Sequence, residues 1–339
     1  MNHGNKALLI YNISGFKLDN TTQYMSYLEN IRNQAFDGQL EVVISAYKPR
    51  PHTISHLRKF YPEFHVNIIN GKYPVNVTCN LTAIEAVKRF GKFSSYTYQT
   101  CDAMMETNTT FQEVFNKMKD NSNYGIVAPQ IDKDSCYAYG LRLGGGRHVV
   151  DDERARYEMF KDGNDYIVPV GRACASHILM YRDTVFDYYG RMIPDIFASH
   201  CTESVFTFVV SALGLDWVIL KDQKLKHGVS MDGPSWDHRP ENRYDLDGNP
   251  LPSYDHPLVE WENKYGPSYM QKVFASPEAI SCGMGFEECS NIVNHDASQF
   301  ENNHCINDEL KEFVKNNVYV SKDVLDYDTI ECEWINADV

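Results

Sequence analysis

The first hundred residues alternate between short apolar runs and longer amphipathic segments, and this alternation limits the fold more than any other feature of the chain. Apolar runs typical of buried strands occur at residues 7–14, 40–45, 65–69 and 95–101. Segments with apolar residues at helical spacing lie between them, at residues 20–35, 53–60 and 80–90. Such an alternation predicts an α/β fold with a mostly parallel sheet and helices on both faces.

The pattern continues beyond residue 110 but becomes less regular. Further strands are predicted at residues 124–129, 166–170, 177–181 and 215–220, and the second and third of these are expected to pair with each other. Helices are predicted at residues 111–119 and 203–213, the second ending at Gly214, a residue type that favours the left-handed conformation after a helix. The polar stretch 132–165, which contains Gly144–Gly146, predicts a functional loop. After residue 234 regular periodicity is lost until a short acidic helix near 307–316.

Charge and cysteine content narrow the classes of protein. The net charge is −14; residues 1–250 carry 27 Lys and Arg against 29 Asp and Glu, whereas residues 251–339 carry 5 against 17. The nearly neutral body and acidic last quarter do not favour a nucleic-acid-binding protein, which usually has a basic face. Nine cysteines without a CxxC pair favour reduced thiols over a zinc site or disulfide framework.

The apolar runs also bear on location. The chain contains no run of about 18 apolar residues, so its sequence predicts no transmembrane helix. The first apolar run is short for a signal peptide and has no small-residue cleavage site after it, so it is better interpreted as a buried strand. We therefore expect a cytoplasmic protein, in the host cytoplasm if its origin is viral.

One aspartate, Asp102, directly follows the predicted strand at 95–101. Open α/β sheets bind ligands in the crevice outside the carboxyl ends of their strands. A carboxylate there can hold a hard divalent cation against phosphate oxygens, which is the arrangement of a nucleotide-sugar site. An aspartate that caps the following helix is the alternative interpretation.

Several short blocks of the sequence, spread over about residues 5–230, resemble the GT-A glycosyltransferases, in particular the family-2-like group. The resemblance rests on the order of the elements and on the blocks Asn80–Ala86, Tyr98–Ala103, Tyr124–Pro129, Arg172–Phe186, Ser199–Phe206 and Lys226–Ser230. It implies a GT-A catalytic domain over residues 1–233, with a donor-binding half at about 1–130 and an acceptor-side half at about 131–233. Residues 234–339 then form an irregular acidic C-terminal extension.

The resemblance also implies the chemistry. The donor would be a nucleoside-diphosphate sugar, UDP-linked in our expectation, and the acceptor a hydroxyl of a glycan. Asp102 would be a ligand of Mn²⁺ or Mg²⁺, and His227 a second ligand that favours manganese. Glu203, in the first turn of a predicted helix, would be the general base of an inverting transfer. The alternatives are that His227 is an ordinary surface residue, that Glu203 is an ordinary glutamate of a first helical turn, and that the transfer retains the configuration of the sugar.

Further residues at the predicted strand ends and loops are expected to contact the donor. These are Tyr11, Asn12 and Ser14 at base and ribose, Ser45 and Tyr47 near the base, Asn80 near the diphosphate or ribose, Thr100 and Cys101 beside Asp102, and Arg147 at phosphate. Ordinary loop polarity explains each of them equally well.

The sequence departs from the family pattern at three places. Thr100 stands where the first acid of the DxD signature is expected, the second strand ends in Ser45–Tyr47 rather than in an aspartate, and Ser204 follows Glu203 where a second acid is usual. The change at the second strand leaves recognition of the base open.

Two other functions therefore stay open. The Asn-, Lys- and Tyr-rich composition is typical of phage or viral proteins, and some phages glycosylate hydroxymethylated bases of their own DNA, so modified DNA is a second acceptor class. A non-catalytic module that binds a nucleotide sugar or a glycan is the third hypothesis, and the missing first acid of DxD favours it.

Overall fold

The computed structural model describes most of the first 230 residues and a C-terminal segment. The described residues are 4–14, 21–47, 49, 51–70, 73, 75–101, 103–131, 139–141, 147–149, 160–168, 177–195, 202–227, 308–323 and 325–335.

The N-terminal half follows the predicted alternation of strands and helices. Its elements are β1 (Lys6–Ser14), α1 (Thr21–Arg32), β2 (Gln39–Tyr47), α2 (Pro51–Phe60), β3 (His65–Ile69), α3 (Val75–Phe90), β4 (Ser95–Gln99), β5 (Ala103–Met105), α4 (Thr110–Asp120) and β6 (Tyr124–Ile131). The remaining elements are β7 (Tyr139–Leu141), β8 (Arg147–Val149), β9 (Tyr166–Ile167), β10 (Ile178–Arg182), α6 (Asp183–Tyr189), α7 (Thr202–Ala212), β11 (Asp216–His227), α10 (Asp308–Val318), η6 (Tyr327–Thr329) and β12 (Cys332–Ile335). Gly214 has a φ of 70° after α7, as the sequence predicts.

Ten strands form one mixed sheet in the order β12-β3-β2-β1-β4-β10-β6-β11-β5, with β9 paired to β11. The pairs β1–β2, β1–β4, β2–β3 and β6–β11 are parallel. Because β10 is antiparallel to both β4 and β6, these two strands share one direction. The β3, β2, β1, β4, β6 and β11 strands thus run the same way, which confirms the predicted α/β class with a mostly parallel sheet.

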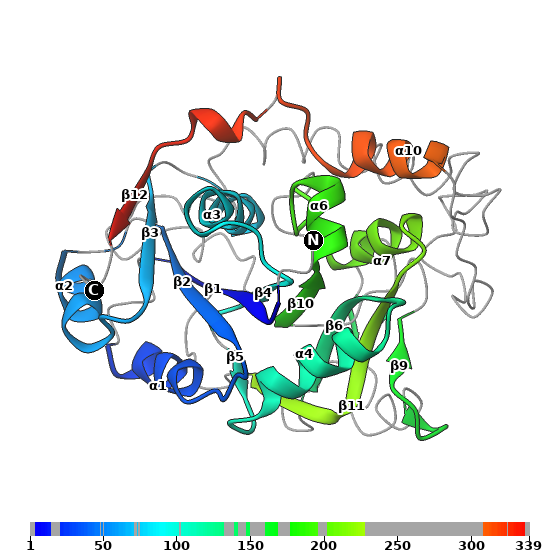
Figure 1. The fold of residues 1–339 in the computed structure, drawn as a ribbon, viewed down its shortest axis with the longest axis horizontal. Helices are drawn as coiled ribbons and strands as arrows, with labels where there is room; N and C mark the ends of the chain where they lie inside the picture. Colours follow the sequence, from blue (N-terminus) through cyan, green and yellow to red (C-terminus); the bar gives the residue numbers. More distant parts are fainter. Residues whose placement is uncertain are drawn as a thin grey trace.

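Helices cover both faces of this sheet, as Figure 1 shows. On β1 the side chains alternate between the faces. Leu8 and Ile10 belong to the core cluster that also contains residues of α3, α6, α7 and α10, whereas Leu9 belongs to the cluster with residues of α1, α2 and α4. This period of two follows from the pleat of a strand. Within the described residues both faces of the sheet are thus covered by apolar side chains, so the ends of the strands are where we look for a ligand site.

The predicted pairing of strands 166–170 and 177–181 is wrong. The β9 strand pairs with β11, and β10 lies between β4 and β6. Four consecutive β10 residues, Ile178–Tyr181, are buried, as expected for a central strand that is covered on both faces. An apolar run of this kind shows burial but does not identify the neighbouring strand.

Part of the predicted C-terminal extension is built into the same domain. The α10 helix confirms the helix predicted near 307–316, and its Val314 and Val318 belong to the core cluster that contains Leu8. The β12 strand extends the sheet by pairing antiparallel with β3. Figure 1 shows the segment from α10 to β12 running along the helices of one face. The α10 helix and the β12 strand thus contribute to the core and to the sheet of the α/β fold.

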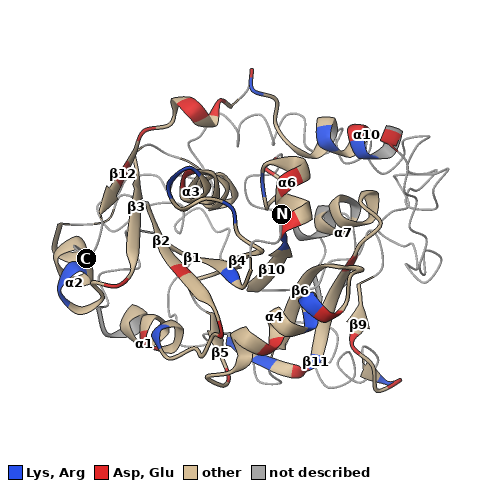
Figure 2. Ribbon diagram, in the orientation of Figure 1, with Lys and Arg blue, Asp and Glu red and all other residues tan. Residues whose placement is uncertain are grey.

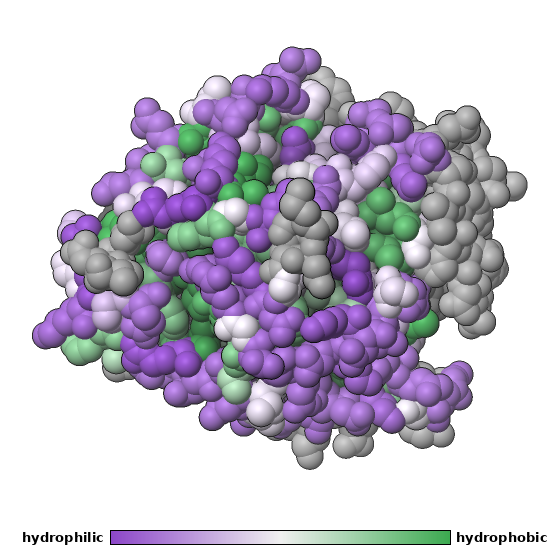
Figure 3. All heavy atoms as spheres, in the orientation of Figure 1, coloured by the Kyte–Doolittle hydropathy of each residue, from purple (hydrophilic) through white to green (hydrophobic). Residues whose placement is uncertain are grey.

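Surface charge and hydropathy are mixed over the described elements. Acidic and basic residues intersperse on α1, α4 and α10 (Figure 2). The surface over α4 is largely hydrophilic (Figure 3). Among the described residues, the large hydrophobic side chains that are exposed are Phe60, Val75 and Ile167. None of the helices in these parts of the chain is long and apolar enough to cross a membrane.

Candidate functional site at the carboxyl ends of the strands

The register of the parallel strands brings the predicted donor-binding residues to one edge of the sheet. Asn12 is the register partner of Ser45, and Ser14 is the partner of Tyr47. On the other side of β1, Tyr11 is the partner of Gln99, which directly precedes Thr100. The predicted convergence of these strand ends is therefore present in the backbone. The side chains of Ser14 and Tyr47 lie outside the described part of the structure.

Tyr11 is fully buried on the face covered by α1, α2 and α4. Its hydroxyl donates a hydrogen bond to the carbonyl oxygen of Cys101 at 2.9 Å. Tyr11, which we predicted to contact the base and ribose, thus holds the segment that follows β4. An aromatic side chain in the middle of an apolar strand is the sequence signal for this structural role.

Asn12 and Ser45 lie on the opposite face, in a buried polar row beneath α3. Asn12 Nδ2 donates to Thr78 Oγ1 at 2.9 Å, and Thr82 Oγ1 donates to Ser45 Oγ at 3.0 Å. Asn67 Nδ2, from β3, donates to Thr82 Oγ1 at 3.1 Å. Asn12, Ser45 and Asn67 are at most 8% exposed. The row fastens α3 to the carboxyl ends of three strands, and threonines four residues apart on one helix face are the signal that could have revealed it.

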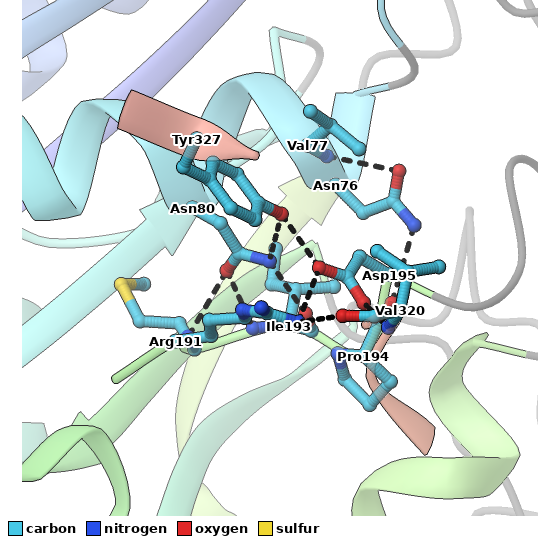
Figure 4. Close-up of polar contacts among 10 residues, drawn as sticks. Asn76, Val77, Asn80, Arg191, Ile193, Pro194, Asp195, Val320 and Tyr327 are labelled. Atoms are coloured by element: carbon cyan, nitrogen blue, oxygen red, sulfur yellow. Dashed lines mark hydrogen bonds and ion pairs between the residues drawn. The ribbon is translucent and has the colours of Figure 1, made fainter. Parts of the chain in front are cut away.

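Asn80 is also buried, and its amide is fully used inside the protein. Its Oδ1 accepts hydrogen bonds from the amides of Met192 and Ile193 at 3.0 and 2.9 Å. Its Nδ2 donates to the carbonyl of Ile193 at 2.7 Å and to the hydroxyl of Tyr327 at 3.3 Å (Figure 4). A carboxamide can make four such bonds, so in this arrangement none is left for a diphosphate.

The same close-up shows a buried carboxylate that our sequence analysis missed. Asp195 is 1% exposed and accepts hydrogen bonds from Arg191 Nη1, the hydroxyl of Tyr327 and the amide of Val320, at 2.9, 2.6 and 2.7 Å (Figure 4). Burial raises the pKa of Asp195, and the three donors oppose that rise. Together with Asn80, this carboxylate joins α3, the segment that follows α6 and the C-terminal segment.

The turn between β4 and β5 lies at the centre of this edge of the sheet. The amide of Thr100 donates to the carbonyl of His177 at 2.9 Å, and the amide of Ala103 donates to the carbonyl of Thr100 at 3.4 Å. The hydroxyl of Thr100 is buried without a hydrogen-bond partner among the described residues. Cys101 is half-buried. Asp102 itself lies outside the described residues.

His227 ends β11 and is the register partner of Ala103 in the antiparallel pair of β11 and β5. The fold therefore places the backbone of His227, one predicted metal ligand, opposite Ala103, which follows the other predicted ligand, Asp102, in the sequence. The side chain of His227 is not described, and within the described residues no group of three or more His, Cys, Asp or Glu side chains is close enough to hold a metal ion. Carboxylate and imidazole are nevertheless a donor set that suits Mn²⁺.

Glu203 is the second residue of α7, and Arg147 begins β8 in the small antiparallel pair with β7. The side chains of both lie outside the described set. Further along α7, Phe206, Val209 and Val210 pack in the core cluster that contains Trp217 of β11. The helix is thus anchored through its later turns, and its first turn has the partial positive charge that stabilises a carboxylate.

No protein-family model matches the chain, and no curated protein sequence matches it. Many solved structures are similar to the chain, and three of them are described here. TarS from S. aureus has 14% identity and a TM-score of 0.48 over 66% of this chain and 37% of its own. S. aureus TarS 1–349, in complex with UDP-GlcNAc, has 11% identity and a TM-score of 0.45 over 66% of this chain and 58% of its own.

The third solved structure is the mannosyltransferase PcManGT from Pyrobaculum calidifontis, in complex with GDP-Man and Mn²⁺. It has 14% identity and a TM-score of 0.49 over 86% of this chain and 76% of its own. The chain thus spans less than two thirds of the length of either TarS chain. At these identities and scores, activity has to be argued from the residues of the chain itself.

Proposed function

We propose that this protein is a metal-dependent glycosyltransferase that moves a sugar from a nucleoside-diphosphate sugar to a hydroxyl group of a glycan. The observation that carries the proposal is the pairing of β5 with β11, which brings the backbone of His227 opposite the residue after Asp102. This pairing lies at the carboxyl edge of a mostly parallel sheet, where α/β proteins bind nucleotides.

Asp102 and His227 are the residues that would hold the cation. A bound Mn²⁺ or Mg²⁺ supplies a positive charge that balances the diphosphate as the nucleoside diphosphate departs. Further candidates for contacts with the donor are Ser14 and Tyr47, which end β1 and β2, and Thr100 and Cys101, which follow β4. Tyr11, Asn12, Ser45 and Asn80 have hydrogen-bond partners inside the protein, so we assign them to the frame of the site.

Glu203 is the proposed general base. A carboxylate in the first turn of a helix stays ionised, because the helix dipole favours its charged form. An ionised carboxylate can accept the proton of the acceptor hydroxyl during an inverting transfer. Arg147 would contact the phosphates from the β7–β8 pair.

Donor hydrolysis by the purified protein tests the proposal. UDP-, GDP- and TDP-sugars are incubated with Mn²⁺ or EDTA, and UDP-GlcNAc and GDP-Man are included because they are the ligands in the two complexes described above. We expect release of one nucleoside diphosphate that requires the metal and is lost in Asp102→Ala. A Glu203→Gln variant should keep donor binding and lose transfer to the acceptor.

Nucleotide binding separates the remaining outcomes. If no donor is turned over, calorimetry with the same nucleotides shows whether the folded protein binds any of them. Binding that persists without turnover, even with glycan acceptors added, would favour the non-catalytic module. The absence of both binding and turnover would refute the proposal. Transfer to hydroxymethylated DNA in place of a glycan would identify the second acceptor class.

A further inference from the structure

The two residues that flank Asp102 in the sequence are each tied to a buried side chain. The carbonyl of Cys101 accepts a hydrogen bond from the hydroxyl of Tyr11 at 2.9 Å. The carbonyl of Ala103 accepts one from Gln99 Nε2 at 2.8 Å. Tyr11 and Gln99 are both 0% exposed, and they are register partners on β1 and β4. The backbone before and after Asp102 is therefore held by one pair of neighbouring side chains.

The choice of side chain at Gln99 argues that its amide has a role. A buried carboxamide is costly unless its polar atoms are hydrogen-bonded. Gln99 Oε1 has no hydrogen-bond partner among the described residues, so the bond from Nε2 to Ala103 is what offsets this cost. A Met or Leu side chain would fill a similar volume without a buried polar group. The amide thus serves the turn rather than the packing of the core.

Ala103 links this turn to the second proposed metal ligand. Its amide donates to the carbonyl of Thr100, and it is paired in register with His227. A displacement of Ala103 would therefore alter the turn and the end of β11 together.

We infer that Tyr11 and Gln99 are positioning residues for Asp102, because they fix the backbone of Cys101 and Ala103 on either side of it, and that this raises the affinity of the protein for a divalent cation. This inference rests on the proposed function. Neighbouring residues that are held by hydrogen bonds lose less conformational freedom when the cation binds, so the affinity for the cation is higher.

The test is the affinity of the full chain for Mn²⁺, measured by electron paramagnetic resonance of the free ion. Saturating UDP, GDP or TDP is present in three parallel series, and each series is referred to the same nucleotide and Mn²⁺ without protein. Tyr11→Phe removes the hydroxyl and keeps the ring, and Gln99→Met removes the amide and keeps most of the volume. A hydrogen bond contributes about 1 kcal/mol, so each variant should bind Mn²⁺ about fivefold more weakly. The double variant should bind more weakly than either.

Tyr61→Phe is the matched control. The hydroxyl of Tyr61, another buried tyrosine, donates to the carbonyl of Met25 at 3.2 Å, in the α1–α2 region of the fold. Its removal should lower the melting temperature and leave the Mn²⁺ affinity unchanged. Melting temperatures without metal show how much each substitution costs the fold.

The outcomes distinguish this inference from the proposed function. If the wild-type protein binds no Mn²⁺ with any of the three nucleotides, both are refuted. If Asp102→Ala loses Mn²⁺ binding while Tyr11→Phe and Gln99→Met bind as the wild type does, the inference is wrong and the function stands. An equal loss of affinity in Tyr61→Phe would also refute the inference, because the effect would then follow from stability alone. Should Gln99→Met fail to fold, Tyr11→Phe decides.

Discussion

Removing the hydroxyl of Tyr327 tests how the C-terminal segment is fastened to the rest of the domain. This hydroxyl donates to Asp195 at 2.6 Å and accepts from Asn80 Nδ2 at 3.3 Å (Figure 4). Tyr327→Phe keeps the ring, which packs with Ile69, Val77 and Leu81, and removes only the two hydrogen bonds.

The magnitude follows from the partners that remain. A hydrogen bond to a charged acceptor contributes roughly 1.5–3 kcal/mol. Asp195 keeps its bonds to Arg191 and the amide of Val320, so its charge stays partly compensated. Asn80 Nδ2 keeps its shorter bond to the carbonyl of Ile193, so that loss is small. We expect Tyr327→Phe to lower the free energy of unfolding by about 2 kcal/mol.

Urea denaturation, followed by tryptophan fluorescence and extrapolated linearly to water, measures this change. Tyr189→Phe is the control, because Tyr189 is 6% exposed and its hydroxyl donates to a neutral acceptor, the carbonyl of Val209, at 3.2 Å. The control should lose about 1 kcal/mol or less. If Tyr327→Phe loses no more than Tyr189→Phe, the bond to Asp195 does not stabilise the fold and our account of the segment is refuted.

Two further predictions concern the sheet and the chain end. The pKa of Glu41 is lowered chiefly by its hydrogen bond with His65 Nε2 at 3.2 Å, and burial partly offsets this effect. The ionised Glu41 therefore stabilises the fold above its unfolded pKa of 4.5, and this contribution is lost as the pH falls through its lower folded pKa. Urea denaturation at neutral and acidic pH should show the difference between the wild type and Glu41→Gln shrinking at acidic pH, and a constant difference would contradict this. A chain that ends at residue 307 lacks β12 and the buried Val314, Val318 and Tyr319, so it should show no cooperative urea transition. A transition like that of the full chain would mean that residues 308–335 are dispensable.

Local sequence patterns were sufficient to predict most of the elements. Strand and helix periodicity identified β1 to β4 and the helices between them, because burial on one or both faces imposes a repeat of about 2 or 3.6 residues on the apolar side chains. The same reasoning placed the ends of β1, β2 and β4 at one edge of the sheet, and the role of Asp102 there stays a prediction. The helix at 308–318 and the left-handed Gly214 followed from equally local signals.

The pairing of strands that are distant in the chain was decided only by the tertiary structure. An apolar run does not identify the strand beside it, so the place of β10 between β4 and β6 could not be predicted.

The roles of the polar residues were hidden for the same reason. From the sequence, Asn80 is a candidate for the diphosphate or ribose at the start of a predicted helix, but its hydrogen bonds reach residues 113 and 247 positions away. A polar side chain satisfies its hydrogen-bonding capacity wherever the fold brings a partner, whether a ligand or the protein itself. The sequence by itself therefore determined where polar groups gather, and the packing of α3 against the segment after α6 and the C-terminal segment decided which of them the protein uses for its own frame.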